Sequence, residues 1–316
     1  MSEELVATIA AVLEGDRHAI ARAITRVEND PAAAAAIIGG VHAAGGGALL
    51  VGVTGSPGVG KSSLVDRMTA AWRARGRRVA VLAVDPSSPF TGGAVLGDRV
   101  RMQNHAGDEG VFVRSMATRG KLGGLARATG DAAVVLDAAG FDVVVIEPVG
   151  VGQAEVEISR AADVTAVVTL PGTGDGVQAI KAGVMEIADL FVVNKADLAG
   201  AGRAVTEIEA ALSLAELPPE AWRAPVLQTT ATRNEGVGEV LNTIDRFREH
   251  GDAGLTERRR ERAAARIRQI LADRVVAGVE ASGGIDRAVD AITDGTLDPY
   301  AASETLLRDR SHREGG

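Results

Sequence analysis

The chain has 316 residues, of which 46% are hydrophobic and 24% charged, and a formal net charge of −8. This length suits one large α/β domain with appended segments, or two smaller domains. The absence of cysteine excludes disulfides and thiolate metal sites, while the negative charge and the 3% aromatic content argue against a nucleic-acid-binding protein.

The sequence shows no sign of a membrane or export segment. No apolar run reaches the roughly 20 residues that a membrane-spanning helix needs. The N-terminal stretch MSEELVATIAAVLEGDRHAI is acidic and lacks the basic region and cleavable apolar core of a signal peptide. We therefore expect a cytoplasmic protein without a membrane partner. The five histidines are scattered without ligand spacing, which argues against a structural zinc site.

The first predicted elements are helices. Residues 3–43 carry apolar side chains at three- and four-residue spacings, as at Leu5 and Ile9. The glycine-rich run Ala43–Gly47 ends this pattern and marks a boundary. We therefore expect an N-terminal helical extension over residues 1–45.

The middle of the chain alternates between two patterns. Short runs rich in Val, Leu and Ile are separated by helical stretches, and these runs are LLVGVTG, RRVAVLAVD, GVFVRSM, FDVVVIE, VTAVVTL, DLFVVNK and APVLQTT. Such runs are typical of a mostly parallel sheet that is covered by helices on both faces. The sequence therefore predicts an α/β domain over residues 46–252.

The C-terminal part, residues 253–316, is again helical. Ile267, Ile270 and Leu271 fall on one stripe of its first helix. Such a face is buried either on the chain's own core or on a second subunit, and both alternatives stay open from the residues alone. The arginines of Arg258–Arg268 alternate with acidic residues, which favours a solvent-exposed helix face over a nucleic-acid site.

The segment Val51–Met68 reads VGVTGSPGVGKSSLVDRM and matches a phosphate-binding loop. Gly55, Gly60, Lys61 and Ser62 satisfy G-x-x-x-x-G-K-[ST] between a predicted strand and a predicted helix. Glycines allow backbone N–H groups to converge on phosphates, and the helix N-terminus adds the positive end of its dipole. The lysine reaches the β and γ oxygens, and the serine can bind magnesium. A nucleotide site is therefore predicted here.

The segment Asn194–Asp197 reads NKAD and favours guanine as the base. It follows an apolar run, at the sheet edge where loops meet a ligand. The carboxylate of Asp197 can accept hydrogen bonds from guanine N1 and the 2-amino group, whereas adenine offers no matching donors. The segment Thr229–Thr232 fits either backbone contacts to the guanine oxygen or an ordinary polar strand end.

Two acidic segments lie between these motifs. Asp85 ends one predicted strand and Asp98 follows on a glycine-flanked loop, while Glu147 ends another strand. Carboxylates at the sheet edge that carries the phosphate loop can hold magnesium directly or through water. Their glycine-rich continuations can change shape when the γ-phosphate leaves, so we interpret both segments as switches. A simple loop cap or turn remains the alternative for Asp85 and Asp98.

The chain resembles the MeaB/ArgK family of GTPases from about residue 3 to about residue 308. The resemblance rests on the phosphate loop together with DPSSPFTGGAVLGDRVRM, SMATRGKLGGLA, EPVGVGQAEVEI, PGTGDGVQAIKAGVMEIADLFVVNKADL and DPYAASETLL. It implies a P-loop NTPase fold of the SIMIBI type, with an N-terminal helical extension and a C-terminal helical arm that forms a homodimer. It also implies that PGTGDGVQAIK relays the nucleotide state to a partner.

The resemblance assigns roles to individual positions. The residues implied to bind the phosphates are Gly55, Ser56, Pro57, Gly58, Val59, Gly60, Lys61, Ser62 and Ser63. Those implied to bind guanine are Asn194, Lys195, Asp197, Thr230, Ala231 and Thr232. Ser62, Asp85, Asp98 and Glu147 would surround Mg²⁺, and the expected catalytic residues are Lys61, Glu147 and Gln153, the last at the place where some GTPases orient the attacking water.

The implied function is a Mg²⁺-dependent hydrolysis of GTP to GDP and phosphate. The GTPase would act as a chaperone for an adenosylcobalamin-dependent acyl-CoA mutase of the methylmalonyl-CoA mutase type. It would gate cofactor loading and protect or reactivate the mutase. The cobalamin signature D-x-H-x-x-G is absent, since its nearest approach, Asp16 and His18, is followed by Ala21 where glycine is needed. We therefore expect cobalamin to be bound by the partner.

One position departs from the family pattern. Pro148 stands where the family usually has threonine in E-T-V-G. Proline lacks a backbone N–H and fixes φ near −65°, so an amide contact to the γ-phosphate is lost at this position. A contact of this segment with the γ-phosphate is therefore expected from Gly150 and its neighbours.

Two other functions are weighed against this one. A kinase linked to basic amino-acid transport needs a second pocket and a base for its acceptor, and no such constellation is evident. A nickel-type metallochaperone GTPase shares the fold, but the absence of cysteines and of histidine clusters argues against it.

Overall fold

The computed structural model of the chain describes residues 2–85, 105, 107–117, 124–148, 161–172, 184–215, 218 and 221–314, with the backbone alone at a few positions such as Asp85. Two compact units are formed, Met1–Arg259 and Arg260–Gly316. The predicted division at residues 45/46 and 252/253 stays a prediction. Within the described ranges, no helix is both long and apolar enough to cross a membrane.

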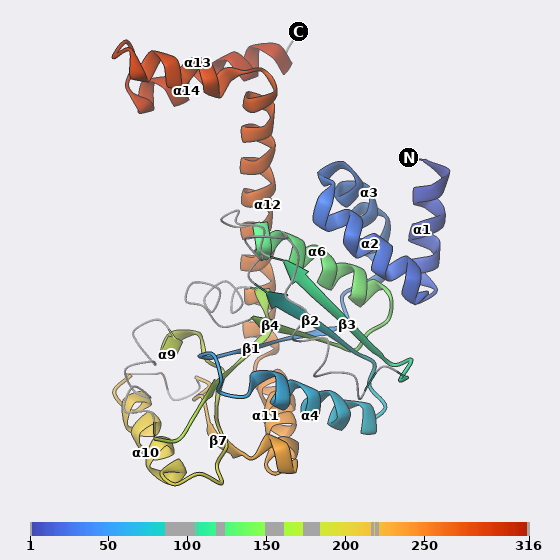
Figure 1. Cartoon of the computed structure of the whole chain (residues 1–316), viewed down its shortest axis with the longest axis vertical. Helices are drawn as coiled ribbons and strands as arrows, with labels where there is room; N and C mark the ends of the chain where they lie inside the picture. Colours follow the sequence, from blue (N-terminus) through green and yellow to red (C-terminus); the bar gives the residue numbers. More distant parts are fainter. Residues whose placement is uncertain are drawn as a thin grey trace. The chain divides into compact units, whose positions relative to one another are not determined.

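A seven-stranded sheet forms the centre of the first unit (Figure 1). Its order is β3-β2-β4-β1-β5-β6-β7, and every neighbouring pair is parallel. The strands are β1 (Leu49–Thr54), β2 (Val79–Asp85), β3 (Val111–Ala117), β4 (Val143–Pro148), β5 (Val164–Thr169), β6 (Leu190–Asn194) and β7 (Val226–Thr229). The predicted parallel α/β fold is confirmed.

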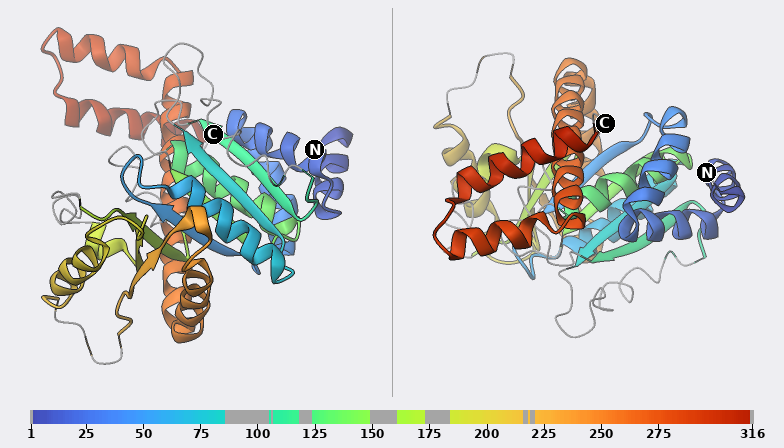
Figure 2. Two further views of the ribbon diagram at one scale, coloured as in Figure 1. Left: turned by 60° about the horizontal axis from the view of Figure 1, so that its bottom comes forward. Right: turned by 90° about the horizontal axis from the view of Figure 1, so that it is seen from above.

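Helices cover both faces of this sheet, as Figure 2 shows from two further directions. One face packs against α1 (Glu3–Leu13), α2 (Arg17–Asn29), α3 (Pro31–Val41) and α6 (Gly124–Ala138), and at its other end against α10 (Ala201–Leu212). The opposite face packs against α4 (Lys61–Ala74) and α11 (Val237–His250). Shorter elements are η1 (His42–Ala44), α9 (Val184–Ile187) and η3 (Ala231–Arg233).

Local sequence signals set the first helices. Asp16 caps α2 by accepting from the backbone N–H of Ala19. Asp30 caps α3 in the same way, and Pro31 occupies the first helical position, where its missing N–H costs nothing. The apolar stripe of these helices, with Ile24 fully buried, shares one core with α6 and the sheet.

The second unit is helical throughout its described part. It contains α12 (Asp252–Ala281) from Arg260 onward, α13 (Gly284–Thr293) and α14 (Pro299–Glu314). The last two pack against each other. Gly284 permits this contact, because a Cβ there would press on Leu306 and on Val279.

Candidate functional site

The predicted phosphate loop lies between β1 and α4, as its motif requires. Gly55 has φ +139° and Gly60 has φ +93°, both in the region that favours glycine. A Cβ on Gly55 would overlap the backbone oxygen of Val168, and one on Gly60 would overlap the side chain of Asn194. The loop therefore runs close to β5 and β6, and it ends at the N-terminus of α4, where backbone N–H groups and the helix dipole favour an anion.

Lys61 is a buried cation inside this loop. Its Nζ donates to the backbone oxygen of Gly55 at 2.7 Å and to that of Ser56 at 3.1 Å. The side chain is therefore folded back over the loop, with its charge where phosphate oxygens are expected to bind.

Ser62 and Glu147 bring the tips of two elements together. The Ser62 hydroxyl donates to Glu147 Oε1 at 2.6 Å, and both side chains are buried. Glu147 lies on β4, in register with Ala83 of the neighbouring β2. A hydroxyl and a carboxylate are the hard oxygen ligands that Mg²⁺ prefers, so this donor set fits the metal.

The remaining predicted metal and catalytic residues are only partly placed. Asp85 ends β2, at the sheet edge that also carries Glu147, but its side chain is not described. Asp98 and Gln153 lie outside the described residues, as does most of the segment PGTGDGVQAIK. Pro148 is the last residue of β4.

Asn194 connects the phosphate loop with the predicted base-recognition segments. Its Nδ2 donates to the Val59 oxygen at 2.9 Å, and its Oδ1 accepts from Thr229 Oγ1 at 3.0 Å and from the Ala231 amide at 3.2 Å. Asn194 is buried. The neighbouring Lys195 has φ +56° and donates from Nζ to the Gly58 oxygen at 3.0 Å. The two motifs, 135 residues apart in the chain, are thus in direct contact.

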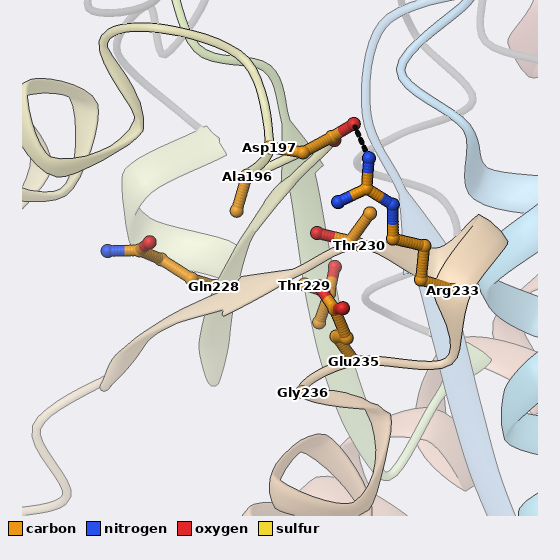
Figure 3. A pocket seen from close by; sticks show the side chains of 8 residues that line it. All are labelled: Ala196, Asp197, Gln228, Thr229, Thr230, Arg233, Glu235 and Gly236. Carbon is orange, nitrogen blue, oxygen red and sulfur yellow. Dashed lines mark ion pairs between the residues drawn. The ribbon is translucent and has the colours of Figure 1, made fainter.

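A pocket of about 300 Å³ opens beside these segments at the ends of β6 and β7 (Figure 3). Its lining residues are Ala196, Asp197, Gln228, Thr229, Thr230, Arg233, Glu235 and Gly236. Asp197 and Thr230 were predicted for the base, whereas Arg233 and Glu235 were not. Asp197 Oδ2 lies 3.4 Å from Arg233 Nη2. Thr232 is exposed and is not part of the lining.

Arg233 was not predicted as a site residue, because the predicted base-binding segment ended at Thr232. The polar run Thr229–Thr232 leads directly into this arginine, so its position in the chain was the available signal. The pairing of Arg233 with Asp197 was not predictable from the sequence, because it depends on β6 and β7 being neighbours in the sheet.

Comparisons with known proteins match nearly the whole chain. The family described as methylmalonyl-CoA mutase-associated GTPase MeaB matches residues 20–283. A protein of Pyrococcus abyssi named as a GTPase is 48% identical over 303 residues, covering 94% of each chain. The methylmalonic aciduria type A homolog of Caenorhabditis elegans, named as mitochondrial, is 35% identical over 268 residues, covering 82% of this chain and 67% of that protein.

A solved structure extends the similarity to three dimensions. The structure titled LAO/AO transport system kinase has a TM-score of 0.72 and 28% identity, covering 98% of this chain and 99% of that one. The chain belongs to the MeaB family of P-loop GTPases and hydrolyses GTP.

Proposed function

We propose that this GTPase serves an adenosylcobalamin-dependent acyl-CoA mutase of the methylmalonyl-CoA mutase type. The nucleotide state gates loading of the cofactor and protects or reactivates the mutase, while the cobalamin itself is bound by the mutase. The family description and the name of the C. elegans relative support a mutase partner. We also place the protein in the cytoplasm, with no nucleic acid or membrane among its partners.

The observation that carries the proposed site is the side chain of Asn194. Its hydrogen bonds connect the phosphate loop at Val59 with the turn at Ala231. The distance between the proposed phosphate-binding and base-binding residues is therefore fixed in the protein. Asp197, which lines the pocket, accepts from N1 and the 2-amino group of guanine in this proposal. Asn194, Lys195 and the segment Thr230–Thr232 form the remaining base-binding residues in this proposal.

The residues from Gly55 to Ser63 hold the phosphates. Lys61 exchanges its bonds to the Gly55 and Ser56 oxygens for bonds to phosphate oxygens, and stabilises charge on the transferring group. Ser62, Asp85, Asp98 and Glu147 hold Mg²⁺ in this proposal. The bound metal supplies further stabilisation of that charge.

Water is the proposed nucleophile, and Gln153 the proposed residue that orients it. Glu147 is buried beside Ser62 and completes the proposed catalytic set. Because Pro148 has no N–H, any contact from the backbone of this switch segment to the γ-phosphate comes from Gly150 or its neighbours in this proposal.

We further propose a homodimer formed through the C-terminal unit. Of the large hydrophobic side chains that are exposed in the described parts of the chain, eight of twelve lie after Arg260: Ile267, Leu271, Val276, Ile285, Val289, Leu297, Tyr300 and Leu307. Exposed apolar groups concentrated on one unit support an interface there.

The test is capture of purified methylmalonyl-CoA mutase by the protein loaded with a non-hydrolysable GTP analogue or with GDP, in Mg²⁺. We expect recovery to differ between the two states. Lys61→Ala should lower GTP turnover by about 10²–10³-fold, as loss of a transition-state donor does. Arg203→Ala, which removes an exposed cation paired with Glu207 on α10, is the control and should leave turnover unchanged.

Equal recovery in both states would contradict gating. Phosphate transferred to a protein or small acceptor, instead of released into solution, would support a kinase in place of the GTPase chaperone. If Lys61→Ala hydrolyses GTP as fast as the unsubstituted protein does, the proposed catalytic role of Lys61 is contradicted.

A further inference from the structure

Arg233 contributes the single positive charge among the described residues that line the pocket. Its Nη2 lies 3.4 Å from Asp197 Oδ2, and Figure 3 shows the guanidinium reaching from η3 toward that carboxylate, beside Thr230. The Arg233 side chain is 60% exposed and that of Asp197 is 31% exposed. The pair is therefore long, partly solvated and weakly held.

The turn that carries Arg233 is fixed, although the side chain is long. Its backbone N–H donates to the Thr230 oxygen at 2.9 Å, and the Thr230 N–H donates to the Glu235 oxygen at 3.1 Å. Asn234 has φ +58° and closes the turn, and Gly236 follows where a Cβ would overlap the Gln228 oxygen. Arg233 can therefore move its guanidinium by side-chain rotation alone, without rebuilding the pocket wall.

The chemistry of the pair matches that of the expected ligand. In guanine, C2 with N1, N3 and the 2-amino nitrogen forms a guanidine unit, and the N–H groups at N1 and the 2-amino nitrogen are directed at one acceptor. The guanidinium of Arg233 presents the same planar set of N–H donors. Both groups are therefore suited to the same carboxylate oxygens of Asp197.

We propose that Arg233 competes with the guanine base for the carboxylate of Asp197 and thereby sets the affinity for guanine nucleotides. This inference rests on the proposed role of Asp197 in base recognition. Each binding event must break the ion pair, which lowers the affinity. A nucleotide whose base does not use Asp197 gains nothing when the arginine is removed.

The experiment compares the dissociation constants of GDP and ADP for the full-length protein in Mg²⁺, measured by calorimetry. Arg233→Ala should bind GDP about two- to fivefold more tightly, the range expected for an exposed ion pair, with ADP unchanged. Arg233→Lys keeps the charge but loses the planar donor set, so its dissociation constant for GDP should lie between those of the unsubstituted protein and Arg233→Ala. Arg203→Ala removes an equal charge from another exposed pair and should change neither constant.

The outcomes separate this inference from the function on which it rests. If the unsubstituted protein prefers GDP but Arg233→Ala binds GDP equally well or more weakly, the competition is disproved and the proposed base site stands. If the unsubstituted protein binds GDP and ADP equally, the role of Asp197 fails and the inference fails with it.

Discussion

At the scale of single residues, Asn194 is held by three hydrogen bonds from its side chain. The side-chain amide of Asn194 forms hydrogen bonds with one carbonyl of the phosphate loop, one hydroxyl of β7 and one backbone amide of η3. Because the side chain is buried, removing it leaves those groups without that partner and away from water. Asn194 therefore acts on the nucleotide by holding the loop and the base pocket in place.

We expect Asn194→Ala to lower the free energy of unfolding by about 1–3 kcal/mol, the cost of leaving buried polar groups unsatisfied. The same substitution should weaken GDP binding, because the loop loses its link to the base segments. Urea unfolding and a GDP titration measure the two effects. Asn242→Ala is the control: Asn242 is exposed on α11 and accepts from Arg75, and its loss should cost less than about 0.5 kcal/mol. Equal losses in both variants would contradict the linking role.

The residue scale also shows where prediction from sequence stops. The spacing of Gly55, Gly60 and Lys61 predicted a loop whose glycines are required, and the φ angles agree. Asn194, Lys195 and Asp197 of the motif NKAD were all predicted to bind the base, but a sequence motif does not show which protein groups each side chain contacts. The bond from Asn194 to Val59 and the pair of Asp197 with Arg233 depend on how the strands are ordered.

At the scale of elements, charged pairs join helices to the starts of strands. Arg258 on α12 donates to both carboxylate oxygens of the buried Asp189, before β6. Arg259 pairs with the buried Asp163, before β5, and this bond raises the pKa of the Arg259 guanidinium. The sequence predicted only a solvent-exposed face for these arginines. Their partners are 69 and 96 residues away, beyond what alternation with acidic neighbours can indicate.

A second pair joins the last turn of α4 to the turn before β3. Arg73 donates from Nε and Nη2 to the two oxygens of Asp108, each at 2.8 Å. The Arg73 guanidinium, assisted by the backbone N–H of Gly110, holds the pKa of the Asp108 carboxyl below its ordinary value of 3.8. The folded protein thus releases this proton more readily than the unfolded chain does. The pair therefore contributes stability above pH 3.8, which is lost as the pH falls through the lower folded pKa.

Because the pKa of Asp108 is lowered in the folded protein, the stability lost in Asp108→Asn should depend on pH. At about pH 7 the variant should be less stable than the unsubstituted protein by about 1 kcal/mol, since it lacks a charge-assisted, partly exposed pair. On acidification the difference should shrink, because the aspartate becomes protonated in the unsubstituted protein as well. Urea unfolding of both proteins at neutral and acidic pH measures it. A difference that stays constant with pH would show that the charge of Asp108 is not what stabilises the turn.

At the scale of the whole molecule, the layered first unit was predictable and the role of the second was not. Long runs of Val, Leu and Ile can be buried only between two helical layers, so the parallel sheet was predicted from composition and order. An apolar helix stripe has several ways of being buried, and the residues around Ile267 and Leu271 left two of them open. Both side chains are more than half exposed in the described structure, and this exposure is what the proposed homodimer rests on.

The homodimer proposal predicts the effect of placing charge on that face. Ile267 and Leu271 are 59% and 57% exposed, and burying the exposed part of each against a partner should contribute about 1–2 kcal/mol. The double substitution Ile267→Asp and Leu271→Asp should therefore weaken self-association by more than about 100-fold. Light scattering coupled to size-exclusion chromatography should then report the mass of a monomer, with helical circular dichroism retained. Leu214→Asp, at an 84% exposed position in the first unit, is the matched control and should keep the dimer mass. A dimer that persists in the double variant places the interface elsewhere, because burying two aspartates from each copy would be too costly to maintain.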